Sequence, residues 1–182
     1  MITETVNTIN SNIAKYMDAY PCMAGYKLYG IAEQVIRRYN ADEWEPLIVD
    51  SDCEDHTVFV DDDYPLGIYH RLLAKTYSTP ERKNQFGDDV VQNVTAEMIL
   101  VCWAFRKYLN VTAETIERII YASLPDKTLA LQSTFDRKAV FSGEFSGIPF
   151  NIPEDVLLFS MRYRYSYPVS SRECIEVENI CK

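Results

Sequence analysis

The most regular pattern in the chain is VLLFSMRYRYSY, residues 156–167. Apolar and aromatic side chains occupy every second position: Leu157, Phe159, Met161, Tyr163, Tyr165 and Tyr167. Small or charged side chains such as Ser160, Arg162 and Arg164 lie between them. This period of two residues is typical of a β-strand with one face in a core. Such a strand is on the order of 40 Å long, so we expect its tyrosine-rich end to meet another subunit.

A second strand is predicted over residues 94–105, VTAEMILVCWAF. The segment alternates at first and then becomes apolar on both faces, which indicates cover on both sides or a central place in a sheet. Shorter segments with strand composition are 26–31, 34–39, 46–49, 57–60, 68–77, 128–135 and 138–141. The polar residues 78–89 contain Pro80 and Gly87 and are predicted to form a loop.

Two helices are predicted. The first begins at Ile2 and runs to about Tyr20, with one apolar stripe of Ile2, Val6, Ile9, Ile13 and Met17. The second helix covers residues 112–124, where Thr112 is a suitable N-cap and Val111 and Ile116 stand at the positions of a hydrophobic staple. Pro125 ends it.

The order of these segments predicts an α+β fold. Most strands follow one another without a helical crossover, so the sheet should be mainly antiparallel, flanked by the N-terminal helix and the helix near 112–124. We expect residues 1–168 to form a single domain and residues 169–182 to form a polar tail.

Composition excludes several classes of protein. The chain has 182 residues, of which 47% are hydrophobic and 25% charged, enough for a core without a metal or disulfide staple. Its formal charge of −9 argues against a protein whose main function is to bind nucleic acid. No apolar run approaches the roughly 20 residues of a membrane span. The five cysteines show no paired spacing, so we expect reduced thiols in a protein made in the cytoplasm.

Residues 42–63 are strongly acidic and contain no Lys or Arg. The ten carboxylates are Asp42, Glu43, Glu45, Asp50, Asp52, Glu54, Asp55, Asp61, Asp62 and Asp63. A solvated loop is one interpretation, and a surface that repels a polyanion is another. Asp50, Asp52 and Glu54 alternate like the start of a calcium loop, but the sixth position is Asp55 instead of Gly. We therefore expect no dedicated metal site.

Catalytic and binding alternatives are weak. Cys53 with His56 or His70 is a conceivable thiol–base pair, but no nearby cation or glycine-containing elbow supports it. Arg162 and Arg164 are able to bind phosphate or acidic side chains of a partner, although cross-strand pairing is the simpler interpretation. The tyrosine row is more typical of a core or an interface than of a nucleotide platform.

The order of elements resembles that of the tail terminator and tail-completion proteins of tailed bacteriophages. The resemblance rests on the N-terminal helix, on strand 94–105 followed directly by helix 112–124, on the Leu124-Pro125 stop, and on the final strand 157–165. It covers most of residues 1–168 in element order and contains no diagnostic motif.

The resemblance implies a non-enzymatic virion protein, made in the host cytoplasm, that forms a ring at the head–tail junction. Six copies are favoured and twelve are possible, with tail-tube, portal or connector proteins as neighbours. The resemblance implies that the protein binds no metal, cofactor or membrane. It also implies that DNA passes through the ring without being bound specifically. The expected interface or lumen residues are Asp61, Asp62, Asp63, Arg162, Arg164, Tyr163, Tyr165 and Tyr167. The alternative is a small cytoplasmic module that binds a cation or a partner through the acidic residues 42–63.

Overall fold

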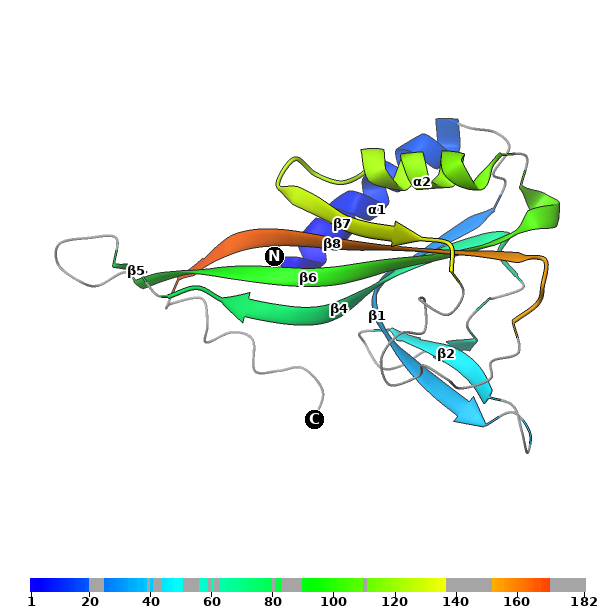
Figure 1. Ribbon diagram of the computed structural model, residues 1–182, viewed down its shortest axis with the longest axis horizontal. Coiled ribbons are helices and arrows are strands. Elements are labelled where there is room, and N and C mark those ends of the chain that lie inside the picture. Colours follow the sequence, from blue (N-terminus) through cyan, green and yellow to red (C-terminus); the bar gives the residue numbers. More distant parts are fainter. Residues whose placement is uncertain are drawn as a thin grey trace.

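The computed structural model describes residues 1–19, 25–38, 40, 44–50, 56–58, 60, 63–79, 81–82, 90–109, 111–136 and 152–170. These residues form an α+β fold in which two helices flank a mostly antiparallel sheet, as the sequence predicted (Figure 1). The helices are α1 (Ile2–Ala19) and α2 (Ala113–Ala122), and a short 3-10 turn covers Arg106–Tyr108.

The strands are β1 (Tyr26–Arg38), β2 (Trp44–Asp50), β3 (His56–Val58), β4 (Leu66–Tyr77), β5 (Glu81–Arg82), β6 (Val90–Phe105), β7 (Thr128–Thr134) and β8 (Val156–Ser170). Most predicted strands are confirmed, with two differences. β1 is one continuous strand where two pieces were expected. β5 lies inside the segment that was predicted to be a loop, where it pairs with β6. The predicted strand 138–141 and the end of the tail, residues 171–182, lie outside the described residues.

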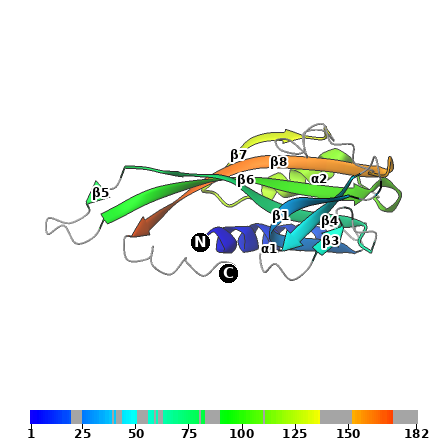
Figure 2. The same ribbon diagram turned by 90° about the horizontal axis from the view of Figure 1, so that it is seen from below.

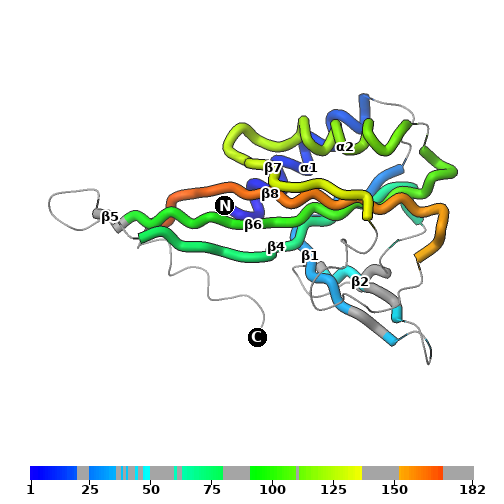
Figure 3. The backbone as a smooth tube through the Cα atoms, viewed as in Figure 1, coloured from blue at the N-terminus to red at the C-terminus, as the bar shows by residue number. Residues whose placement is uncertain are grey.

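The sheet has the strand order β3-β2-β1-β4-β6-β8-β7, and β5 pairs with β6 off this path. The pairs are antiparallel except for β1 with β4, which is parallel. β6 is the long central strand, and its register with β8 runs from Val91 opposite Ser170 to Phe105 opposite Val156. Figure 3 shows β4, β6 and β8 continuing together past the start of α1.

Both helices cover the same face of the sheet, because their buried residues belong to one core cluster with the same side of β6 and β8. Figure 2 gives a second view of α1 and α2 beside these strands. The stripe of α1 is buried at Val6, Ile9, Ile13 and Met17, as predicted from its spacing. In α2 the buried residues are Ile116, Ile119 and Ile120. Thr112 caps α2, because its Oγ1 accepts a hydrogen bond of 3.3 Å from the Thr115 amide. The helices meet the odd-numbered residues of β8 and the even-numbered residues of β6, such as Phe159 and Met98.

A second core covers the other face of the same strands. Buried residues of β6 and β8, including Val101, Trp103 and Leu158, pack there with Ala32 of β1 and Ile48 of β2. β1 bends away from β4 to pair with β2, and this turns the β1–β2 pair beneath the sheet in Figure 1. The two-faced apolar pattern of residues 98–105 is thereby explained, since each face has its own cover.

Trp103 depends on a glycine directly across the ladder. Gly67 of β4 is the register partner of Trp103, and the indole ring lies over its Cα. A Cβ at position 67 would lie inside the van der Waals radius of the indole carbons. Tyr29 and Tyr69 flank the same ring, with centroid distances of 5.6 and 6.5 Å. The ring therefore has no room to move aside.

We predict that Gly67→Ala lowers the free energy of unfolding by about 3 kcal/mol, because the added methyl group overpacks the Trp103 pocket. Urea unfolding followed by tryptophan fluorescence measures this loss. Gly30→Ala is the matched control, since a Cβ there meets no atom within 4 Å. Equal unfolding midpoints for the two variants would contradict the packing described above.

Candidate functional site

His70 is fully buried between α1 and the sheet. Asn10 of α1 donates through Nδ2 to the Tyr29 carbonyl at 2.9 Å, which directs its Oδ1 toward the imidazole. His70 Nε2–H then donates to Asn10 Oδ1 at 2.9 Å, and Nδ1 accepts from the Tyr163 hydroxyl at 2.9 Å. Every polar atom in this chain of bonds has a partner, which is the usual requirement for burying such groups.

This arrangement makes His70 a structural residue. Burial lowers the pKa of the imidazole from 6.5 to about 3, so the ring is neutral at physiological pH. Both ring nitrogens are engaged, and neither faces solvent. His70 therefore cannot act as the base of the thiol–base pair considered from the sequence. The other members of that pair, Cys53 and the side chain of His56, lie outside the described residues.

The structure gives no other reactive or metal-binding group at the surface of its described residues. Cys102 is a free, buried thiol, and burial raises its pKa, so it stays protonated. The remaining four cysteines lie outside the part of the chain that the structure describes. Within that part, no group of three or more His, Cys, Asp or Glu is placed to hold a metal ion. No helix there is long and apolar enough to cross a membrane.

The acidic residues 42–63 carry the entire net charge of the chain. They hold 10 of the 27 carboxylates and none of the 18 Lys and Arg residues, so the remainder of the chain sums to 18 − 17 = +1. β2 and β3 belong to this acidic segment and form one end of the strand order. Asp63 is exposed in the turn before β4, and Asp61, Asp62 and residues 51–55 lie outside the described residues. Asp42 and Glu43 also lie outside the described residues, so Asp63 is the one carboxylate of this segment whose side chain the structure places.

The candidates on β8 separate into core and surface. Tyr163 and Tyr165 are buried beneath the helices, so they are core residues and have no surface to offer a second subunit. Tyr167 is half-buried and stacks on Tyr165 with a centroid distance of 5.6 Å. Arg164 pairs across the ladder with Glu97, Nη2 to Oε2 at 3.4 Å, which agrees with the simpler interpretation. Arg162 is half-buried and lies opposite Gln132 of β7.

The structure adds a feature that the sequence did not reveal, the open edge of β7. One side of β7 pairs with β8, and no described strand pairs with its other side. Leu129 and Leu131 on this strand are 60% and 40% exposed. The strand Thr128–Thr134 contains no charged residue and no proline. We call Thr128–Thr134 the β7 edge.

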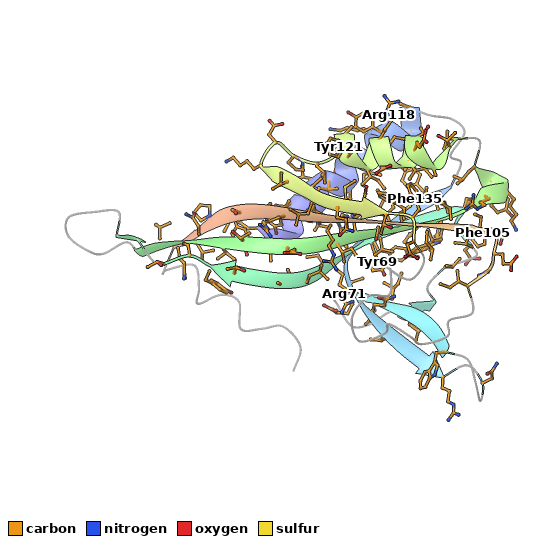
Figure 4. All side chains as sticks on the ribbon, in the orientation of Figure 1. Tyr69, Arg71, Phe105, Arg118, Tyr121 and Phe135 are labelled. Atoms are coloured by element: carbon orange, nitrogen blue, oxygen red, sulfur yellow. The ribbon has the colours of Figure 1, made fainter. Side chains whose placement is uncertain are left out.

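A second open edge lies on the opposite side of the central strands. β1 pairs with β4 only as far as Ile31 opposite His70, so Arg71–Tyr77 extend beyond it. No described strand covers this outer side of Arg71–Tyr77. Leu73 and Tyr77 are 38% and 59% exposed. We call Arg71–Tyr77 the β4 edge; Figure 4 labels Arg71, near the point where β1 leaves β4, and Phe135, directly after β7.

Neither protein-family models nor curated protein sequences give a match to this chain. The function has to be inferred from the geometry itself. His70 and Cys102 are buried, whereas backbone edges and apolar side chains among the described residues are exposed. Such a surface is suited to strand pairing with another protein chain.

The burial of His70 predicts a pH dependence of stability. Its folded-state pKa is about 3 and its ordinary value is 6.5, so between these values the unfolded chain binds a proton that the folded chain excludes. Stability is therefore lost as the pH falls below about 6.5, and His70 alone contributes a loss of about 2 kcal/mol between pH 7 and pH 5.

Urea unfolding of the wild type and of His70→Gln at pH 7 and pH 5 measures this contribution. Glutamine keeps one donor and one acceptor but does not titrate, so the variant should lose about 2 kcal/mol less over the same interval. An identical loss in both proteins would show that His70 is protonated in the fold at little cost.

Proposed function

We propose that this protein is a structural component of the virion of a tailed bacteriophage, which forms a ring of identical copies at the head–tail junction and performs no catalysis. The role is that of a tail terminator, neck or connector component. The observation that carries the proposal is the pair of open edges, the β4 edge and the β7 edge, on a sheet in which His70 and Cys102 are buried. The position at the head–tail junction is proposed from the resemblance in element order to tail terminator and tail-completion proteins.

The β7 edge supports self-assembly because, within the described part of the chain, it lacks most devices that protect edges in monomeric proteins. Such devices include charged side chains, prolines and covering elements. The β7 edge has no charge and no proline, and it exposes two leucines. It contains one β-bulge, between Ala130 and Gln132, which shortens the regular ladder without adding charge.

The distribution of charge supports a ring around DNA. Six copies at −9 each sum to −54, and this charge originates in residues 42–63. A channel lined by negative charge repels the phosphate backbone, so the duplex passes without adhering. We place the acidic segment, with Asp61, Asp62 and Asp63, toward the lumen or the adjoining ring.

The ring is tested by mass and by shape. Light scattering behind size-exclusion chromatography should give a mass of six chains, or of twelve, and negative-stain images should show closed rings with a central hole. Mass spectrometry of purified virions tests the location, and a neighbourhood of portal, capsid and tail-tube genes supports it. A protein that stays monomeric at every concentration, and also in the presence of tail tubes, would contradict the proposal.

Replacing Asp61, Asp62 and Asp63 together by Asn should leave folding unchanged and reduce assembly or DNA passage, because the variant removes three negative charges per copy from the proposed lumen. Particle yield and infectivity measure the effect. A matched control is Glu114→Gln with Asp126→Asn and Asp155→Asn, which removes the same charge from exposed positions elsewhere. Unchanged yield and infectivity in the first variant, or equal losses in both variants, would contradict the proposed role of the acidic segment at the lumen or the adjoining ring.

A further inference from the structure

We infer that the β4 edge of one copy pairs with the β7 edge of the next copy, so that the central sheet continues from subunit to subunit. This inference rests on the proposed ring and specifies its subunit contact. The partner is a second copy of this chain, bound head to tail through two different surfaces.

The two edges lie on opposite sides of the same four strands. Within the order β4-β6-β8-β7, β4 and β7 are the outer strands beyond β1, and across the registers Thr128–Gln132 lie level with Arg71–Lys75. Ser133 and Thr134 lie level with His70 and Tyr69, whereas Thr76 and Tyr77 extend past the start of β7. Their lengths match. The β4 edge is the part of β4 after His70, 77 − 70 = 7 residues, and the β7 edge also has 7 residues.

Strand direction favours this pairing. β4 is antiparallel to β6, β6 to β8, and β8 to β7, so β4 and β7 run in opposite directions. When a second copy continues the sheet in the same orientation, its β4 edge lies antiparallel to the β7 edge of the first. Antiparallel pairing is the slightly more stable ladder per residue. The alternation of strand directions is then unbroken across the contact.

The side chains on the two edges are compatible. The β7 edge is uncharged, and the β4 edge carries Lys75 and also Arg71, whose Nε lies 3.6 Å from Oε2 of Glu33 on β1. Neither edge includes any of the acidic residues 42–63, which hold all the net negative charge of the chain. The contact therefore brings together a neutral edge and an edge whose one charge without a partner among the described residues is Lys75, in a protein whose net negative charge otherwise repels its own copies.

Each edge also presents exposed leucine at a bulge. The bulges fall between Leu72 and Ala74 on β4 and between Ala130 and Gln132 on β7. They set Leu73 and Leu131 outside the ladder, 38% and 40% exposed. Tyr77 and Leu129 are the most exposed apolar residues of the two edges, at 59% and 60%. Pairing would remove this apolar surface from water.

A contact between two different surfaces makes a specific prediction for mixtures. A head-to-tail interface propagates until it closes, whereas a contact between two identical edges stops at a dimer. A copy that has lost only its β7 edge still has a functional β4 edge. A copy that has lost only its β4 edge still has a functional β7 edge. Either copy alone cannot propagate, but together they make one junction.

Sedimentation velocity of three double variants tests the inference. They are Leu129→Asp with Leu131→Asp on the β7 edge, Leu73→Asp with Tyr77→Asp on the β4 edge, and Tyr16→Asp with Tyr108→Asp as a control. The control positions are exposed tyrosines outside both edges, and each variant adds the same charge. The wild type and the control should assemble, each edge variant alone should be monomeric, and an equimolar mixture of the two edge variants should sediment with the mass of two chains.

Three results would overturn the inference. If the β4-edge variant assembles like the wild type while the β7-edge variant does not, two β7 edges pair with each other or β7 binds another surface. If the wild type assembles but the mixture of variants stays monomeric, the ring uses other contacts and only this inference fails. If the wild type itself never assembles, the proposed ring fails with it.

Milder variants keep the test valid if an aspartate pair disturbs folding, which circular dichroism and thermal melts report. Leu131→Ser and Tyr77→Ser add no charge and lie at exposed positions. Each should raise the dissociation constant of the contact roughly tenfold, since either one removes apolar area from the same junction. Unchanged dissociation constants in these folded variants would also overturn the inference.

Discussion

The structure depends on burying both faces of β6. Its second half is apolar on each side, and one layer of cover would leave Trp103 or Leu100 in water. The two helices satisfy one face and the β1–β2 pair satisfies the other. β1 therefore has two roles: its first half extends the main sheet beside β4, and its second half pairs with β2 on the far side. The break between the two halves of β1 is what leaves the β4 edge open.

Polar bonds then fix how the first helix sits on this core. An apolar stripe such as that of α1 can slide or rotate on a sheet at little cost, because hydrophobic contact is not directional. Asn10 and Asn12 remove that freedom. Asn10 bonds β1 and His70 of β4, and Asn12 donates to the Ser123 carbonyl at the end of α2, at 3.1 Å. The histidine that a search for catalytic residues would single out is thus used in holding α1 in place.

Much of the fold was predictable from local pattern. The four-residue and three-residue steps of α1, the Thr112 cap of α2 and the alternation of β8 each depend on neighbours in sequence, and the structure confirms them. The order of strands in the sheet depends on long-range pairing and was not predictable. For this reason the sequence indicated a strand near 128–135 without indicating that it is an open edge, and it suggested Tyr163 and Tyr165 as interface residues although both are core. The one feature of the sequence that pointed to an open edge was the absence of charged residues in Thr128–Thr134.

The central claim is that two open backbone edges are closed by other copies of the same chain. Amide hydrogen exchange measures this directly, by comparing dilute protein with assembled protein at the same pH. Exchange in Arg71–Tyr77 and Thr128–Thr134 should slow on assembly, while β6, already bonded on both sides, should be equally protected in the two samples. Assembled protein in which both segments exchange as fast as in the dilute sample would contradict the account.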